Sequence, residues 1–182
     1  MAIKSTVFKA ELNITDMDRG YYQSHALTIA RHPSETDERM MLRLVAFARH
    51  ASESLELTRG LSADDEPDVW QKDLTGAIET WIELGLPDEK RIKKGCGRAN
   101  EVWVYAYGGR VVDIWWDGIK NALTRFEHLN VVSIPADTLA ELTKMTARTM
   151  QLQCTIQDGQ MWMSDANHNI LVEVTPLQLA RV

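Results

Sequence analysis

Asp68 and Glu83 are the two residues of this sequence whose types and positions best suit metal-assisted chemistry. Asp68 follows Pro67 and opens a short apolar run, and Glu83 lies in the apolar run that follows the turn at residues 74–76. If that turn is the centre of a β-hairpin, Asp68 falls beside Ile82 or Glu83. Carboxylates on neighbouring strands can hold a divalent cation against a phosphate. The sequence therefore predicts a cation site that contains Asp68 and Glu83.

Glu79 is an alternative to Glu83 as the second acid of this site, and Glu83 could also form an ion pair instead of binding a metal. Because side chains alternate along a strand, Glu79, Trp81 and Glu83 share one face, so Glu79 could take the place of Glu83. Glu83 lies among apolar residues, where a carboxylate is costly to bury unless it is paired or bound to a metal. An ion pair with Arg39 or Lys93 would satisfy Glu83 without any catalysis.

Several exact runs of the sequence are similar to a known family. They are MDR at residues 17–19, ARHPSETDERMM at 30–41, LSADDEPDVWQK at 61–72, WIELG at 81–85 and YGGR at 107–110. These runs closely resemble the YaeQ family of bacterial proteins, and the resemblance covers essentially the whole chain. It implies a variant of the PD-(D/E)XK nuclease-like fold, the core of many restriction endonucleases.

The resemblance also implies roles for individual residues. In the nuclease-like fold, acids on two neighbouring core strands bind Mg²⁺, and a lysine two residues after the second acid positions the attacking water. Asp68 matches the aspartate of the PD step, and Glu83 best matches the second acid. Gly85 occupies the position of the lysine, so Lys93 or Lys90 on the following helix is expected to assist the water.

The remaining candidates are a third acid and further cations. The resemblance makes Glu38 the third metal ligand, while the alternative is a surface acid favoured by the positive end of its helix. Lys94 and Lys72 are other substitutes for the missing lysine. Alternatively, Arg91, Lys93 and Lys94 form a solvated basic end that matches the dipole of the helix C-terminus.

Composition bounds the class of protein. The chain has 182 residues, 45% of them hydrophobic and 25% charged, which suits a single domain over residues 1–182. The net charge of −6 means that contact with nucleic acid requires a local basic patch. No run approaches 18 apolar residues and residues 1–16 contain no apolar signal-peptide segment, so we expect neither a membrane span nor a signal segment. Cys96 and Cys154 have neither metal-site nor disulfide-framework spacing, so we expect a cytoplasmic protein, and we expect a monomer.

Several other site types are excluded by motif. The histidines show no HxH or HxxxH spacing, so a zinc site is not expected. The G-x-S-x-G elbow and the G-x-x-x-x-G-K-[ST] loop are both absent.

The patterns predict an α/β (mixed α+β) fold in which a central sheet is flanked by helices and extended by N-terminal and C-terminal hairpins. Strands are expected at residues 3–12 and 25–30, and a hairpin at Asp158-Gly159. A second hairpin is expected to join EVWVYAY and RVVDIWW through Gly108-Gly109. Helices are expected from Ser34 to about residue 51, from Pro87 to Gly97, and over residues 136–146.

Two functions follow as expectations. The first is a Mg²⁺-dependent nuclease in which Asp68, Glu83 and Glu38 bind the metal and Lys93 or Lys90 assists the water. The alternative is a catalytically degenerate accessory protein that binds nucleic acid or a protein partner, with a link to transcription. Gly85 and the acidic net charge favour the alternative.

Overall fold

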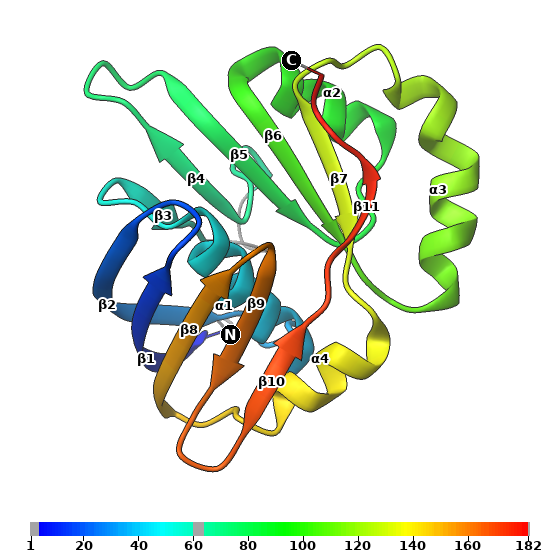
Figure 1. The fold of residues 1–182 in the computed structure, drawn as a ribbon. Coiled ribbons are helices and arrows are strands. Elements are labelled where there is room, and N and C mark those ends of the chain that lie inside the picture. Colours follow the sequence, from blue (N-terminus) through cyan, green and yellow to red (C-terminus); the bar gives the residue numbers. More distant parts are fainter. Residues whose placement is uncertain (1–3, 60–63, 182) are drawn as a thin grey trace. The chain divides into compact units, whose positions relative to one another are not determined.

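The computed structural model describes residues 4–59 and 64–181 (Figure 1). Ile3, the expected start of the first strand, lies outside these residues, as do residues 61–63 of the family-like runs. The chain divides into two compact units: Met1–His50 with Asp137–Glu173, and Ala51–Ala136 with Val174–Val182. The single domain expected over residues 1–182 stays a prediction.

The first unit contains a five-stranded sheet with the order β10-β9-β8-β1-β2. Its strands are β1 (Thr6–Asp16), β2 (Tyr21–Arg31), β8 (Thr149–Gln157), β9 (Gln160–Ser164) and β10 (Asn169–Val172). The β1–β2 and β8–β9 hairpins confirm the expected ones, and Asp158 and Gly159 take φ angles of 52° and 76° in the second turn. Residues alternate between buried and exposed along β1 and β8, so this sheet has one buried face.

The prediction that these two hairpins extend the central sheet is wrong. They join each other instead, because β1 pairs in parallel with β8 from Lys9↔Thr149 to Asp16↔Ile156 (Figure 1). This pairing spans most of the chain length, and no local pattern of residues reveals it. The N-terminal hairpin and the strands from Thr149 to Val172 therefore build a sheet of their own.

Helix α1 (Asp37–His50) belongs to the same unit as this sheet. Helix α4 (Ala136–Thr143) belongs to it as well except for its first residue, because the boundary between the units along the chain falls between Ala136 and Asp137. The expected start of α1 at Ser34 is wrong: the Thr36 hydroxyl accepts a hydrogen bond from Arg39 N at 3.2 Å, as an N-cap does. His25 of β2 meets the ring of Phe47 edge-on at 5.0 Å between centroids, which joins α1 to the sheet.

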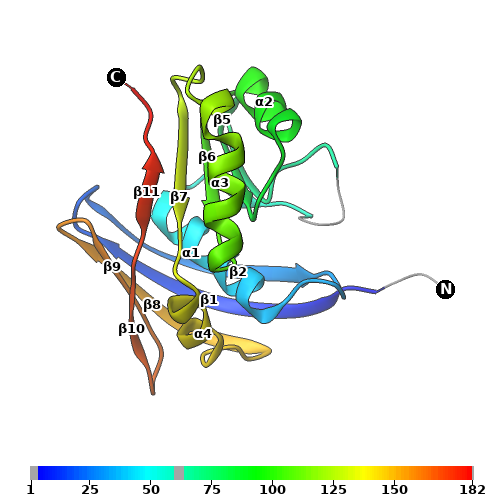
Figure 2. The same cartoon turned by 90° about the vertical axis from the view of Figure 1, so that its right-hand side faces the viewer.

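The second unit contains a six-stranded sheet with the order β11-β7-β6-β5-β4-β3. Its strands are β3 (Leu55–Leu57), β4 (Val69–Lys72), β5 (Ile78–Leu84), β6 (Ala99–Ala106), β7 (Leu129–Ser133) and β11 (Thr175–Gln178). Strands β5, β6 and β7 are parallel, and the other pairs are antiparallel. Helices α2 (Glu89–Arg98) and α3 (Arg110–Leu123) make the parallel crossovers and lie on the same side of the sheet (Figure 2).

The core of this unit is continuous from the sheet to both helices. Trp81, Val102 and Val131 of the sheet share one buried cluster with Ile92 of α2 and Ile119 of α3. Burial of this apolar surface fixes α2 against β5, the strand that carries Glu83.

The expected hairpin at Gly108-Gly109 is wrong. The glycines, at φ angles of 129° and 72°, end β6 and lead into α3 instead of a second strand. The β-branched and aromatic residues of RVVDIWW favour a strand locally. However, Val112, Ile119 and Leu123 are buried at helical spacing and pack as a helix face.

The fold is therefore mixed α+β, with two mixed sheets and four helices among the described residues. None of these helices combines the length and the apolar character that crossing a bilayer requires.

Candidate functional site

The β4–β5 hairpin brings Asp68 and Glu83 together as the sequence predicts. Val69 pairs with Ile82, and Asp68 N donates a hydrogen bond to Ile82 O at 3.0 Å. Asp68 therefore lies at the next position of the ladder, beside Glu83. The expected adjacency of the two acids is confirmed.

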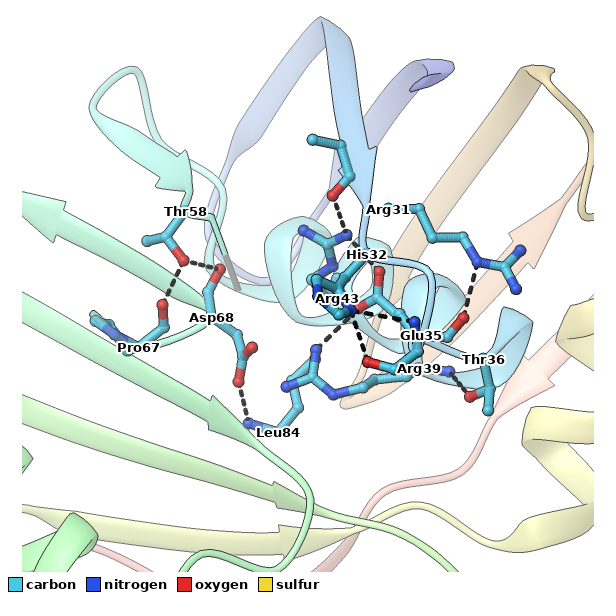
Figure 3. Close-up of polar contacts among 12 residues, drawn as sticks. Arg31, His32, Glu35, Thr36, Arg39, Arg43, Thr58, Pro67, Asp68 and Leu84 are labelled. Atoms are coloured by element: carbon cyan, nitrogen blue, oxygen red, sulfur yellow. Dashed lines mark hydrogen bonds and ion pairs between the residues drawn. The ribbon is translucent and has the colours of Figure 1, made fainter. Parts of the chain in front are cut away.

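Asp68 is buried and held at both its side chain and its backbone. Only 4% of its surface is exposed, and its Oδ2 accepts a hydrogen bond from Leu84 N at 2.8 Å (Figure 3). The hydroxyl of Thr58 donates to the carbonyl oxygens of Pro67 and Asp68 (Figure 3). The carboxylate thus ties the end of β5 to the start of β4.

Glu83 is buried and satisfied by two donors. Its Oε1 accepts a hydrogen bond from Trp81 Nε1 at 2.9 Å and from Arg91 Nε at 2.8 Å. Glu83 is 5% exposed. Burial, followed by the negative charge of Asp68, raises the pKa of Glu83 to about 7, although Arg91 opposes this shift. The two acids are close enough to repel, and Arg91 compensates.

Arg91 is the residue that closes this site. Asp88 caps α2 by accepting a hydrogen bond from Arg91 N at 2.8 Å, which fixes Arg91 in the first turn. Its Nη1 and Nη2 donate to the carbonyl oxygens of Asp64 and Glu66, so the guanidinium joins Glu83 to the acidic loop before β4. A planar guanidinium with several donors suits such a junction better than an ammonium group does.

Sequence reasoning placed Arg91 in a solvated basic end and missed this role. The available signal was its position next to Ile92 and four residues before Gly95, both of which are buried. Arg91 therefore borders the buried face of α2.

The lysines expected to assist catalysis lie elsewhere on α2. Lys90 and Lys93 are both exposed. Lys94 pairs with Asp65 at 2.8 Å. Gly85, where the resemblance would place a lysine, has a φ of 104°, a conformation that L side chains rarely adopt. The catalytic roles of Lys90 and Lys93 stay predictions.

Two further acids, Glu79 and Glu38, were predicted as possible metal ligands. Glu79 of β5 accepts a hydrogen bond from Gln71 Nε2. Glu38 is exposed in the first turn of α1, in the other unit, and its role as third metal ligand stays a prediction.

The donor set around Asp68 and Glu83 does not fit a magnesium ion as it stands. Mg²⁺ requires near-octahedral oxygen ligands with room for several waters. Here Glu83 Oε1 is already bonded to two N–H donors, and Asp68 Oδ2 to one. Among residues 4–59 and 64–181, no group of three or more His, Cys, Asp or Glu is placed to hold a metal.

A family model described as "YaeQ protein" matches residues 1–174. The chain belongs to the YaeQ family. It is 49% identical to the YaeQ protein of Salmonella typhi and 48% identical to that of Escherichia coli K12, each over 178 residues and 98% of both chains. The crystal structure of the YaeQ protein from Xanthomonas axonopodis pv. citri is similar, with a TM-score of 0.92, 45% identity and coverage of 96% of this chain and 99% of that one. The YaeQ protein from Pseudomonas syringae has the same TM-score at 38% identity, with 96% of each chain covered.

In this YaeQ-family chain, Arg39 was a second candidate ion-pair partner for Glu83. Arg39 forms an ion pair with Glu35. Glu35 accepts from Arg39 Nη1 at 2.8 Å and from Arg43 Nη2 at 2.6 Å (Figure 3). Glu35 and Arg43 have side chains that are each 2% exposed. This triad is a buried charge network within the first unit.

The close approach of α2 to Trp81 makes Gly95 necessary. A Cβ on Gly95 would lie 2.8 Å from Trp81 Nε1, the donor to Glu83, whereas a Cβ on Gly97 of the same helix meets nothing within 4 Å. We expect Gly95→Ala to lower the free energy of unfolding by about 1–3 kcal/mol through overpacking. Gly97→Ala should raise it by up to about 1 kcal/mol, because alanine favours helix.

Urea unfolding of the two alanine variants measures this difference. A Gly95→Ala variant as stable as Gly97→Ala would contradict the packing of Trp81 against α2.

Proposed function

We propose that the protein is a nucleic-acid-binding accessory protein built on a variant of the PD-(D/E)XK nuclease-like core, and that it does not hydrolyse its partner. The PD step at Pro67-Asp68, the β4–β5 hairpin and the second acid Glu83 support descent from such a core. The closed state of Glu83 supports the loss of hydrolysis.

The observation that carries this proposal is the Arg91–Glu83 pair. A hydrolytic site needs an acid free to bind a metal and a cation aimed at the scissile phosphate. Glu83 is instead 5% exposed and bonded to Arg91 at 2.8 Å, and Gly85 stands where the lysine would be. Arg91 supplies the positive charge that offsets these acids, so magnesium is not needed for the fold.

A basic helix supplies the surface for nucleic acid. Helix α2 carries five basic residues and one acid in its sequence EKRIKKGCGR, although the whole chain is acidic. Arg91 and Lys94 are engaged with the acidic loop, whereas Lys90 and Lys93 point their charges into solvent. Exposed lysines on one helix can neutralise phosphates without reading the sequence.

A metal-dependent nuclease is the second candidate. Its favouring observation is the adjacency of Asp68 and Glu83, whose mutual repulsion contributes to the pKa of about 7 at Glu83. Clustered acids with a raised pKa are common at functional sites. In that case Arg91 would have to leave Glu83 before a metal could bind.

Fluorescence anisotropy with labelled single-stranded and double-stranded DNA and RNA tests the binding. We expect the affinity to fall about 10-fold to 50-fold between about 50 and 200 mM salt, as for two to three phosphate contacts. The double variant Lys90→Ala/Lys93→Ala should bind at least about fivefold more weakly and with a shallower salt dependence.

The matched control is Lys120→Ala/Lys144→Ala, which removes two exposed lysines that each lie beside an acid, Asp117 and Glu141. This control should bind as the wild type does. Absence of binding at about 50 mM salt, or equal weakening in both double variants, would overturn the role of α2.

A further inference from the structure

The exposed face of the five-stranded sheet carries a polar hollow that the proposed function does not use. It has a volume of about 310 Å³ and lies over β1, β2, β8 and β9 of the first unit. Its lining includes Glu11, Asn13, Ser24, Gln153, Ser164 and Asp165. This volume is at the small end of the range for ligand sites, so it suits a small molecule.

Four of the lining side chains form one row across four strands. Asn13 of β1 pairs with Ser24 of β2 on one side and with Gln153 of β8 on the other, and Gln153 pairs with Ser164 of β9. Residues directly opposite in neighbouring strands point to the same face of a sheet. The register therefore aligns two amides between two hydroxyls, while the alternate residue Leu152 is buried.

The chemistry of the lining selects the class of ligand. No Lys, Arg or His is among the described residues that line the hollow, and Glu11 and Asp165 add negative charge, which disfavours phosphates and other anions. Leu152 is the one apolar residue of the lining and its side chain lies on the buried face of the sheet, so an apolar ligand gains little. Amides and hydroxyls offer donors and acceptors side by side, which complements neighbouring hydroxyl groups of a ligand.

Two aromatic side chains flank the row on the same face. Trp162 lies two residues before Ser164 and Tyr22 two residues before Ser24, and they are 36% and 58% exposed. The intervening pairs Tyr22↔Thr15, Thr15↔Thr155 and Thr155↔Trp162 place both rings in the adjacent row. The face of an aromatic ring offers an apolar surface to the C–H groups of a sugar. The polar side chains beside the ring can then bind the hydroxyl groups of the sugar.

From this arrangement we propose that the hollow binds a neutral sugar of one or two rings. The ring stacks on Trp162 or Tyr22, and its hydroxyls bond to Asn13, to the carboxylates and to Oε1 of Gln153. The Nε2 of Gln153 already donates to Thr15 Oγ1 at 3.2 Å and to Cys154 O at 3.3 Å. A polyamine, which Glu11 and Asp165 would attract, is the charged competitor that the test must separate from a sugar. This binding is independent of the nucleic-acid surface on α2.

Two-dimensional ¹⁵N NMR of the full chain tests the site, because the side-chain NH₂ signals of Asn13 and Gln153 report on the hollow directly. The probes are glucose, galactose, mannose, N-acetylglucosamine, maltose, lactose and chitobiose, with spermidine and inorganic phosphate as charged comparators. We expect at least one sugar to shift these signals in a saturable way at millimolar concentration, and phosphate to leave them unchanged.

A matched pair of variants separates the site from the rest of the sheet. Gln153→Ala should weaken the binding of that sugar at least fivefold, whereas Gln157→Ala, the same change on the same strand and face but outside the hollow, should not. If none of the sugars shifts the signals, or if only spermidine does, the proposal is overturned. Equal weakening in the two variants would overturn it as well.

Discussion

The free energy of unfolding of the wild-type protein is expected to fall as the pH rises from about 4.5 to 7, and Glu83→Gln is expected to abolish this fall. In the folded protein the pKa of Glu83 is raised from 4.5 to about 7. Between these values the folded state holds a proton that the unfolded state has released, so the free energy of unfolding falls as the pH rises. The full difference corresponds to about 3 kcal/mol, and the curve is flat above the folded pKa.

Glutamine resembles the protonated acid and can still accept a bond from Arg91 Nε. We therefore expect the variant and the wild type to agree within about 1 kcal/mol near pH 5, and the variant to be more stable by roughly 3 kcal/mol at pH 8. Urea unfolding at several pH values measures both curves.

Glu79→Gln is the matched control, because Glu79 lies on the same strand and is half-buried beside Gln71. It should keep the wild-type pH profile. If Glu83→Gln and the wild type run parallel from pH 5 to 8, Glu83 is not the buried acid that the structure places beside Asp68.

Glu35→Ala is expected to have the largest effect on stability in the first unit. Glu35 forms ion pairs with both Arg39 and Arg43, and the side chain of Arg43 is as buried as that of the acid, at 2% exposure. Removing the shared carboxylate leaves a guanidinium buried without its counter-charge, and breaking such a pair costs about 3–5 kcal/mol. The free energy of unfolding from urea titration should fall by that amount at neutral pH.

Glu38→Ala is the control for this change, because it removes an exposed acid three residues further along the same segment. Its effect should be at most about 1 kcal/mol, the scale of a charge at the end of a helix dipole. Equal effects of the two substitutions would show that the Glu35 triad does not stabilise α1.

Local patterns predicted most elements of the fold but not their assembly. The hairpins at residues 74–76 and at Asp158-Gly159 were predictable because their turn residues and alternating neighbours are local. The parallel pairing of β1 with β8 was not, since it joins residues from opposite ends of the chain. RVVDIWW was misassigned because its strand-like composition outweighed its helical spacing.

The candidate site also has one part that the sequence predicts and one part that it does not. The adjacency of Asp68 and Glu83 followed from the hairpin register alone. The choice of Arg91 over Lys93 as the cation beside Glu83 depends on which side of α2 faces β5, because these two residues are separated by about 200° of rotation around the helix. Sequence spacing does not fix that rotation until the packing of Gly95 against Trp81 is known.

Incubation of the protein with end-labelled DNA and RNA in millimolar Mg²⁺, followed by denaturing electrophoresis, tests most directly whether Arg91 closes the acidic pair. The closed pair predicts that all substrates remain intact, both with the wild type and with Asp68→Asn. Mg²⁺-dependent cleavage by the wild type that Asp68→Asn abolishes would contradict it.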